Sequence, residues 1–190
     1  MRISVKNKVL LHACCAPCST VGVPALREEG YDVVLYFYGG NIHPLGEWEK
    51  RLNALRILSS AHSSQLIVRP YDTNEWDTAV RGYEKELEGG ARCPICIRLQ
   101  LENAAKIACE LKIPYLCTSL TLSPQKHPDM INSWGNNVSK TYGLMWINRV
   151  WRKKGGFSLS LSESRRLGLY RQNYCGCRYS LSSSHAAARK

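Results

Sequence analysis

Short apolar runs alternate with longer segments of helical periodicity along this chain of 190 residues. The predicted strands occupy residues 8–13, 31–38, 65–69, 114–118 and 144–148. The predicted helices occupy residues 19–30, 47–62, 75–87, 94–111, 127–142 and 158–167. Because parallel strands need helical crossovers, this alternation predicts an α/β fold in three layers, with a parallel sheet covered on both faces.

Unusual polar segments follow the predicted strands at their carboxyl ends. Cys14 and Cys15 follow the first strand, residues 41–44 the second, residues 71–72 the third, and residues 118–121 the fourth. In open α/β sheets, ligands bind beyond the carboxyl ends of the strands. The sequence therefore predicts that its functional site lies at this edge of the sheet.

Seven of the nine cysteines fall into three tight clusters that lie far apart in the sequence. The members are Cys14, Cys15 and Cys18, then Cys93 and Cys96, then Cys175 and Cys177. Clustered thiolates are the ligands of zinc and of iron–sulfur clusters. Seven thiols exceed the four ligands of a structural zinc, so they indicate a second centre, a redox pair or an open coordination position. Cys109 and Cys117 are interpreted as packed core thiols.

Each cluster has its own local geometry. Cys93 and Cys96 form a CxxC pair that Pro94 places at the start of a predicted helix, where the helix dipole stabilises thiolates. Cys175 and Cys177 flank a single glycine. When oxidised, this pair closes a small strained ring of the redox-active kind, and it is equally able to hold a metal.

The formal net charge of +11 is unevenly distributed. Residues 149–178 contain eight basic side chains against one acid, Glu163, and therefore carry +7 (8 − 1). The basic residues are Arg149, Arg152, Lys153, Lys154, Arg165, Arg166, Arg171 and Arg178. A solubilising surface is one interpretation, but interleaved aromatic residues favour contact with a nucleic-acid backbone.

Composition and length predict a single domain over residues 1–181, followed by a disordered tail over 182–190. No signal peptide and no apolar run of membrane-spanning length is visible, so a reducing cytoplasm and no membrane partner are expected. The loop after the first strand lacks the glycines of a phosphate cradle, which argues against ATP.

Taken together, the motifs resemble those of the QueH-type epoxyqueuosine reductases. The matching segments are residues 11–17 (LHACCAP), 38–44 (YGGNIHP), 49–51 (EKR), 92–96 (RCPIC), 118–124 (TSLTLSP) and 168–177 (GLYRQNYCGC). The resemblance implies an enzyme that reduces the epoxide of epoxyqueuosine in tRNA to an alkene, the last step of queuosine biosynthesis. It also implies a fold similar to adenine-nucleotide α-hydrolase-like (HUP) domains, with cysteines replacing the nucleotide loop, and an unidentified electron donor.

The resemblance assigns roles to individual residues. It implies a [4Fe–4S] cluster on Cys14, Cys15, Cys93 and Cys96. Cys175 and Cys177 match either a redox-active pair or ligands of a second metal ion, iron or zinc. Cys18, which stands where some relatives carry aspartate, is a further possible ligand.

Opening an epoxide needs stabilisation of the developing alkoxide, so proton donors are expected near the metal. His43, Tyr174 and Asp129 are the candidates, although a structural role is as plausible for the loop residue His43. The anticodon stem-loop is expected to bind the basic stretch through Arg149, Arg152, Lys153, Lys154 and Arg171.

Three other functions compete with this interpretation. The first alternative is a zinc-stabilised RNA-binding module without catalysis. The second is a sulfur-transfer enzyme acting on tRNA, which would need the phosphate loop that is missing here. A thiol–disulfide oxidoreductase is the third, and it leaves the basic stretch unexplained.

Overall fold

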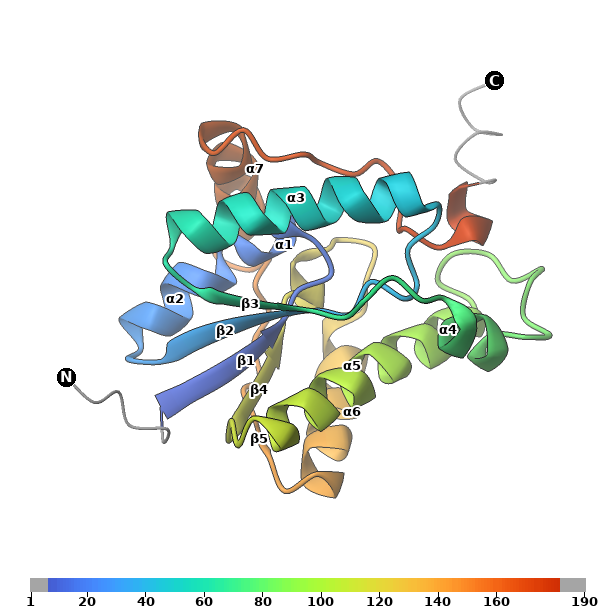
Figure 1. Cartoon of the computed structure of the whole chain (residues 1–190), viewed down its shortest axis with the longest axis horizontal. Helices are drawn as coiled ribbons and strands as arrows, with labels where there is room; N and C mark the ends of the chain where they lie inside the picture. Colours follow the sequence, from blue (N-terminus) through green and yellow to red (C-terminus); the bar gives the residue numbers. More distant parts are fainter. Residues whose placement is uncertain (1–6, 182–190) are drawn as a thin grey trace.

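The computed structural model describes residues 7–181 and contains one parallel sheet of five strands in the order β3-β2-β1-β4-β5 (Figure 1). The strands are β1 (Lys8–His12), β2 (Asp32–Phe37), β3 (Gln65–Val68), β4 (Tyr115–Thr118) and β5 (Met145–Trp146). Strand β1 lies in the centre, where Leu10 is in register with Val34 of β2 and Leu116 of β4. The predicted parallel sheet is confirmed.

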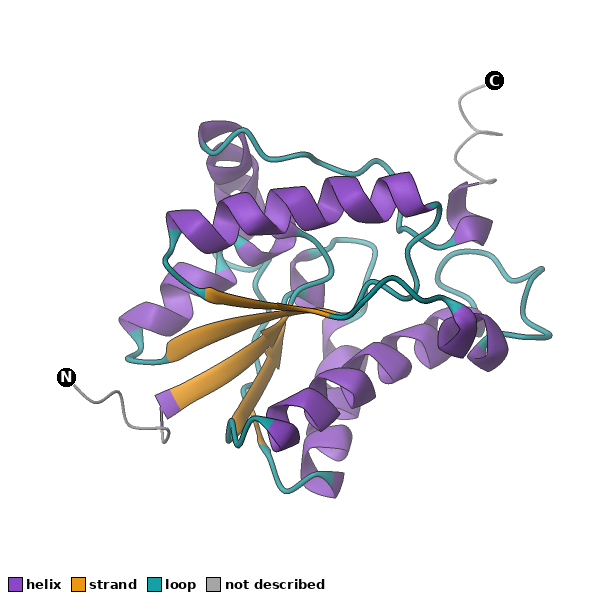
Figure 2. Ribbon diagram, viewed as in Figure 1, coloured by secondary structure: helices purple, strands orange, loops and turns teal. Residues whose placement is uncertain are grey.

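Helices cover both faces of this sheet (Figure 2). One face carries α1 (Ala16–Ser19), α2 (Gly22–Glu28), α3 (Leu45–Ala61) and α7 (Gly156–Arg166). The other carries α5 (Arg92–Glu110) and α6 (Pro128–Thr141), with α4 (Asn74–Ala79) packed against α5 and the short 3₁₀ helix η2 (Leu120–Leu122) after β4. The three predicted layers are therefore present.

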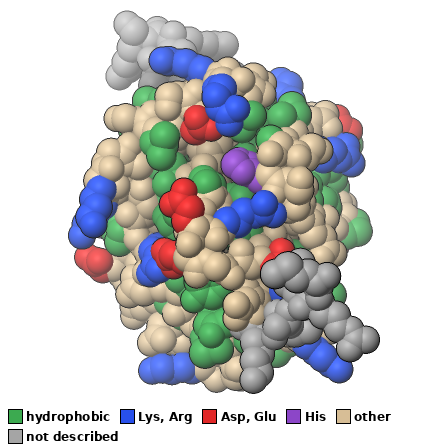
Figure 3. All heavy atoms as spheres, turned by 90° about the vertical axis from the view of Figure 1, so that its left-hand side faces the viewer, with side chains coloured by type: hydrophobic (Ala, Val, Ile, Leu, Met, Phe, Trp, Pro, Cys, Tyr) green, Lys and Arg blue, Asp and Glu red, His purple; other side chains and the backbone are tan. Residues whose placement is uncertain are grey.

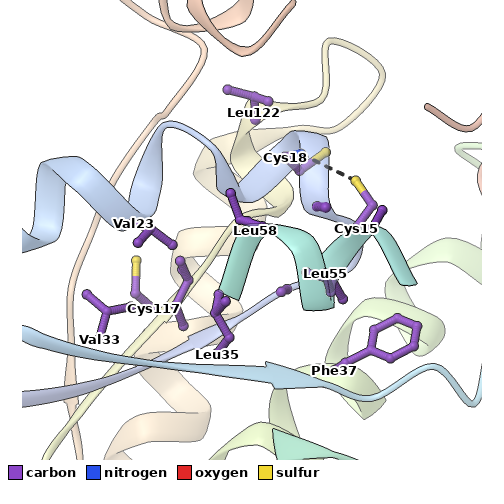
Figure 4. Close-up of a cluster of buried hydrophobic side chains, with 14 of the residues drawn as sticks. Cys15, Cys18, Val23, Val33, Leu35, Phe37, Leu55, Leu58, Cys117 and Leu122 are labelled. Carbon is purple, nitrogen blue, oxygen red and sulfur yellow. Dashed lines mark hydrogen bonds between the residues drawn. The ribbon is translucent and has the colours of Figure 1, made fainter. Parts of the chain in front are cut away.

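Two hydrophobic cores form because successive side chains of a strand point to opposite faces. On one face Leu11 packs in a cluster with Leu35 and with Leu55 of α3, the last two of which are labelled in Figure 4. On the other face Leu10 packs in a cluster with Leu101 of α5. Packing on both faces therefore holds β1 in place, and the first cysteine cluster follows directly after the carboxyl end of this strand.

Two predicted helices differ from the observed ones. The helix predicted over residues 19–30 is observed as α2, which begins later, at Gly22, whereas Ser19 ends the separate helix α1. The two helices are separated at Thr20 and Val21, and the Thr20 hydroxyl donates to the Pro17 carbonyl at 2.9 Å. The helix predicted over residues 75–87 ends at Ala79, and turns follow. Gly82, three residues beyond Ala79, adopts a φ angle of 88°, so the chain cannot continue as a helix through residues 80–87. The predicted disordered tail lies outside the described residues.

None of the helices within residues 7–181 has the length and apolar character needed to span a bilayer.

Close packing between α6 and β5 depends on Gly135. A Cβ atom at this position would lie 2.3 Å from the indole ring of Trp146. We expect Gly135→Ala to lower the free energy of unfolding by about 1–3 kcal/mol, measured by chemical denaturation, because the ring has to move. Gly46→Ala in α3, where a Cβ meets nothing within 4 Å, is the control and should be neutral or slightly stabilising. Equal stability of the two variants would contradict this packing argument.

Candidate metal centre

The turn between β1 and α1 brings three sulfur atoms together. The Sγ atoms of Cys14, Cys15 and Cys18 all lie within 4.8 Å of one another. Cys15 caps α1, since its sulfur accepts a hydrogen bond from the Cys18 amide at 3.4 Å (Figure 4). Because this turn folds back on itself, adjacent cysteines that would diverge on a strand face one common point.

The other two cysteine pairs meet the first cluster around a cavity of about 260 Å³ at the carboxyl edge of the sheet. Six cysteines from all three clusters line it: Cys14, Cys18, Cys93, Cys96, Cys175 and Cys177. Cys15 lies directly behind them, with its sulfur 3.9 Å from that of Cys14. A cavity lined by this many thiols fits a soft metal centre.

Helix α5 positions the second pair at its amino-terminal end. The Cys93 sulfur accepts a hydrogen bond from the Gly89 amide at 3.2 Å. The buried Cys96 sulfur accepts one from the side chain of Gln100 at 3.2 Å. These donors and the helix dipole favour thiolates at this position.

The pKa values of the three thiols in the first cluster are shifted in different directions. Burial acts to raise the pKa of Cys15, but hydrogen bonds from Cys14 and Cys18 and the nearby Arg51 guanidinium lower it well below its usual range. The pKa of Cys14 is raised chiefly by its hydrogen bond with Cys15, and that of Cys18 chiefly by its hydrogen bonds with Cys14 and Cys15, and burial raises both further. Burial also raises the pKa of Cys96 to about 12. A bound metal would therefore displace protons from most of these thiols.

A buried arginine of α3 holds the third cluster in place. Arg51 is 2% exposed and pairs with Glu47 at 2.7 Å, while its other nitrogens donate to the Tyr174 and Cys175 carbonyls at 3.1 and 3.0 Å. Glu47 accepts a further hydrogen bond from Tyr170 at 2.7 Å. The sequence offered one signal for this network, the i,i+4 spacing of Glu47 and Arg51 in a predicted helix.

Two further arginines hold the loops at the rim of the cavity. Arg92 donates to the carbonyls of Tyr83 and Glu86 at 2.9 and 2.6 Å. Arg152 donates to the carbonyls of Ser123 and Lys126 at 2.9 and 2.8 Å. Arg152 was predicted to bind tRNA, but its guanidinium is engaged with the main chain, and we leave it out of the proposed interface.

Lys126 is a cavity residue that the sequence prediction missed. Its Nζ atom lies 3.5 Å from the Cys175 sulfur and 3.4 Å from a carboxylate oxygen of Glu88, and its side chain is 12% exposed. Burial acts to lower the pKa of Lys126, but Cys175 and Glu88 raise it, so the ammonium stays charged. The sequence indicated a role for Lys126 only through its position shortly after β4, at the carboxyl edge of the sheet where ligands are expected.

The three predicted proton donors do not lie together. Tyr174 lines the cavity and donates its hydroxyl to the His43 carbonyl. His43 lies outside the lining, with Nε2 3.8 Å from Asp77, and burial lowers its pKa. Asp129 lines a different hollow between α6 and β5, beside Asn132 and Trp146.

Both cysteines outside the clusters were predicted to be core thiols. Cys117 is 1% exposed and belongs to the core, which confirms its prediction. Cys109 is exposed and donates to the Tyr142 carbonyl at 3.2 Å, so its prediction is wrong. The buried stripe of α5 passes through Ala105 and Ala108, and Cys109 falls beside it.

The predicted tRNA-binding residues divide into free and engaged side chains. Arg149, Lys153 and Lys154 line one surface hollow where α7 begins, and both lysines are exposed. Arg149 also pairs with Glu29 at 2.6 Å, and Arg171 donates to the Ser164 hydroxyl at 3.1 Å. The face at the amino-terminal edge of the sheet, in contrast, mixes acidic and basic side chains (Figure 3).

Residues 9–183 match the family model described as "Epoxyqueuosine reductase QueH". This chain belongs to the epoxyqueuosine reductase QueH family. The QueH of Streptococcus pyogenes serotype M1 is 36% identical over 182 residues, which cover 93% of this chain and 71% of that protein. The QueH of Thermotoga maritima is 37% identical over 176 residues, which cover 91% and 90%.

Solved structures share the fold of this QueH family member at much lower identity. A predicted subunit of a tRNA methyltransferase from Methanocaldococcus jannaschii aligns with a TM-score of 0.56 at 12% identity, over 80% of this chain and 74% of that one. The U34-tRNA thiolase NcsA from Methanococcus maripaludis, solved with its [4Fe–4S] cluster, aligns with a TM-score of 0.55 at 14% identity, over 100% and 67%. These likenesses confirm the predicted α/β fold.

The Arg51–Glu47 pair should dominate the stability of the site. We expect Arg51→Met to lower the free energy of unfolding of the reduced, metal-free protein by about 3–5 kcal/mol, because Glu47 is left buried without its partner. Arg56→Met, an exposed change on the same helix, is the control and should shift it by less than about 0.5 kcal/mol. Denaturant unfolding of both variants measures this, and similar losses would show that the buried pair has no special role.

Proposed function

We propose that this QueH family member reduces epoxyqueuosine in tRNA by means of a [4Fe–4S] cluster held by Cys14, Cys15, Cys93 and Cys96. The observation that carries the proposal is the convergence of all three cysteine clusters on one cavity in a chain of this family. Cys175 and Cys177 line the same cavity and serve as a second metal site, with Cys18, or as a redox-active pair.

The reaction breaks both bonds from the epoxide oxygen to the ring, consumes two electrons and two protons, and releases water. When bound, the cluster supplies the electrons one at a time, and an external donor replaces them. The chain itself contributes the charged groups around the epoxide. Lys126 directs its ammonium group into the cavity, where it stabilises negative charge as it develops on the leaving oxygen.

The protein also has to exclude water and keep the side chains that line the cavity in fixed positions. The Arg51, Arg92 and Arg152 side chains fix the loops that carry Cys175, Glu88 and Lys126, so the lining does not have to reorganise during the reaction. Of the predicted proton donors, Tyr174 is retained because it lines the cavity.

The tRNA is proposed to approach over the start of α7. Lys153 and Lys154 are exposed beside Arg149, and their neighbour Arg152 donates to the carbonyls of Ser123 and Lys126, which line the cavity. Phosphates of the anticodon stem-loop bound there would leave the modified nucleoside near the cysteines.

Cofactor content distinguishes the reductase from a zinc-stabilised RNA-binding module. Protein prepared without oxygen should contain about four iron and four sulfide per chain, with additional iron or zinc at the second site. Cys93→Ser should lower the cluster content, whereas Cys109→Ser, an exposed cysteine outside the cavity, should leave it unchanged. Iron, zinc and acid-labile sulfide analysis measures this. Zinc without sulfide, persisting after attempted reconstitution, would favour the RNA-binding module.

The basic hollow gives a second test. Replacing both Lys153 and Lys154 by Ala should weaken tRNA binding and lower the slope of log affinity against log salt by up to about 2, as expected for two lost phosphate contacts. Lys140→Ala, an exposed change in the last turn of α6, is the control. Binding titrations at several salt concentrations measure the slope, and an unchanged slope would exclude this surface.

A further inference from the structure

Two glutamine side chains point their amide nitrogens at cysteine sulfurs. The Nε2 atom of Gln100 lies 3.2 Å from the Sγ atom of Cys96, and that of Gln172 lies 2.9 Å from the Sγ atom of Cys15. Gln100 is one turn beyond Cys96 in α5, whereas Gln172 lies in the segment between α7 and the third cysteine cluster. Two unrelated elements thus supply the same donor to two sulfurs proposed to bind the same cluster.

The Gln100 side chain lies between the hydrophobic core and the cysteine cavity. It is 3% exposed, next to the core residues Ile97 and Leu101, and it lines the cavity. The amide donates only within its own turn, to the Cys96 carbonyl at 3.2 Å and to the Cys96 sulfur. The indole ring of Trp76 packs in the same small buried cluster as Cys96. Both hydrogen bonds of the Gln100 amide therefore go to Cys96, and one of them goes to its sulfur.

Gln172 donates a hydrogen bond to a fully buried sulfur. Cys15 is buried at 0% exposure and also accepts a hydrogen bond from the Cys18 amide at 3.4 Å. Gln172 itself lines the cavity. The Gln172 amide therefore connects the first cysteine cluster, through Cys15, to the segment that leads into the third cluster.

Hydrogen bonds to ligand sulfurs are among the factors that set the reduction potential of an iron–sulfur cluster. A donor withdraws charge from the thiolate, and the reduced cluster carries one more negative charge than the oxidised one. The donor therefore stabilises the reduced state more and raises the potential.

We propose that Gln100 and Gln172 are positioning residues that raise the reduction potential of the cluster through N–H···S hydrogen bonds to Cys96 and Cys15. The inference rests on the proposed cluster ligands. In this step the oxidised cluster gains one electron from a one-electron reductant, and no bond is formed or broken. The two glutamines thereby make the cluster easier to reduce before each electron passes to the epoxide.

Redox titration of the loaded protein tests this directly. The wild-type protein, Gln100→Leu, Gln172→Leu and the double variant are reconstituted without oxygen, and iron and sulfide are counted. Each is then titrated with dithionite and followed by electron paramagnetic resonance of the reduced cluster. We expect each single variant to shift the midpoint potential to a more negative value, and the double variant to show the sum, because the two sulfurs are different.

Gln125→Leu is the matched control. Gln125 lines the same cavity, but its side chain is exposed and bonds the Ser123 hydroxyl at 3.2 Å, so the potential should stay at the wild-type value. Wild-type potentials in the cluster-loaded Gln100 and Gln172 variants would overturn the inference and leave the reductase proposal standing. Loss of the cluster from a folded Gln172→Leu protein would also overturn it, since a tuning role leaves the cluster bound. A wild-type protein without iron and sulfide would instead overturn the proposed function itself.

Discussion

The buried ion pair between Arg51 and Glu47 joins parts of the site that the chain order keeps apart. It sits in α3, the long helix that follows β2, and reaches the carbonyls of Tyr174 and Cys175 near the other end of the sequence. Leaving Arg51 buried without its partner would cost several kcal/mol, so the pair and the third cysteine cluster have to form together. Gly176 fits this arrangement, since a Cβ there would lie 2.9 Å from the Arg51 guanidinium.

Main-chain carbonyls held by arginine side chains recur around the cavity. Arg51, Arg92 and Arg152 each donate to carbonyls of a loop that contributes to the lining. A guanidinium is always charged and offers several donors in one plane, so one side chain can hold several carbonyls of an irregular loop at once. This explains how irregular loops present cysteine and lysine side chains as a defined lining.

Much of this architecture could be predicted from the sequence because it depends on local patterns. The alternation of buried strands and periodic helices gave the parallel sheet, and strand ends followed by Cys14 and by Thr118 located the functional edge. The early end of α4 was missed because apolar spacing continues past Ala79, while the positive φ angle at Gly82 prevents the helix from continuing. Lys126 was missed for a different reason. Its contact with Cys175 joins residues that are 49 positions apart in the sequence, and no sequence periodicity indicates a contact between such distant residues.

The cysteine that caps α1 links the redox chemistry to a distant surface. Helix α1 has only four residues, and the Pro17 carbonyl within it accepts a hydrogen bond from Ser160 of α7 at 2.7 Å. A change in the bonding of the Cys15 sulfur therefore has a short route, through the Cys18 amide and this carbonyl, to the helix beside Lys153 and Lys154. The sulfur that is proposed to bind the cluster is thus also the cap of the short helix against which α7 packs, so a substitution at Cys15 removes a ligand and a helix cap together.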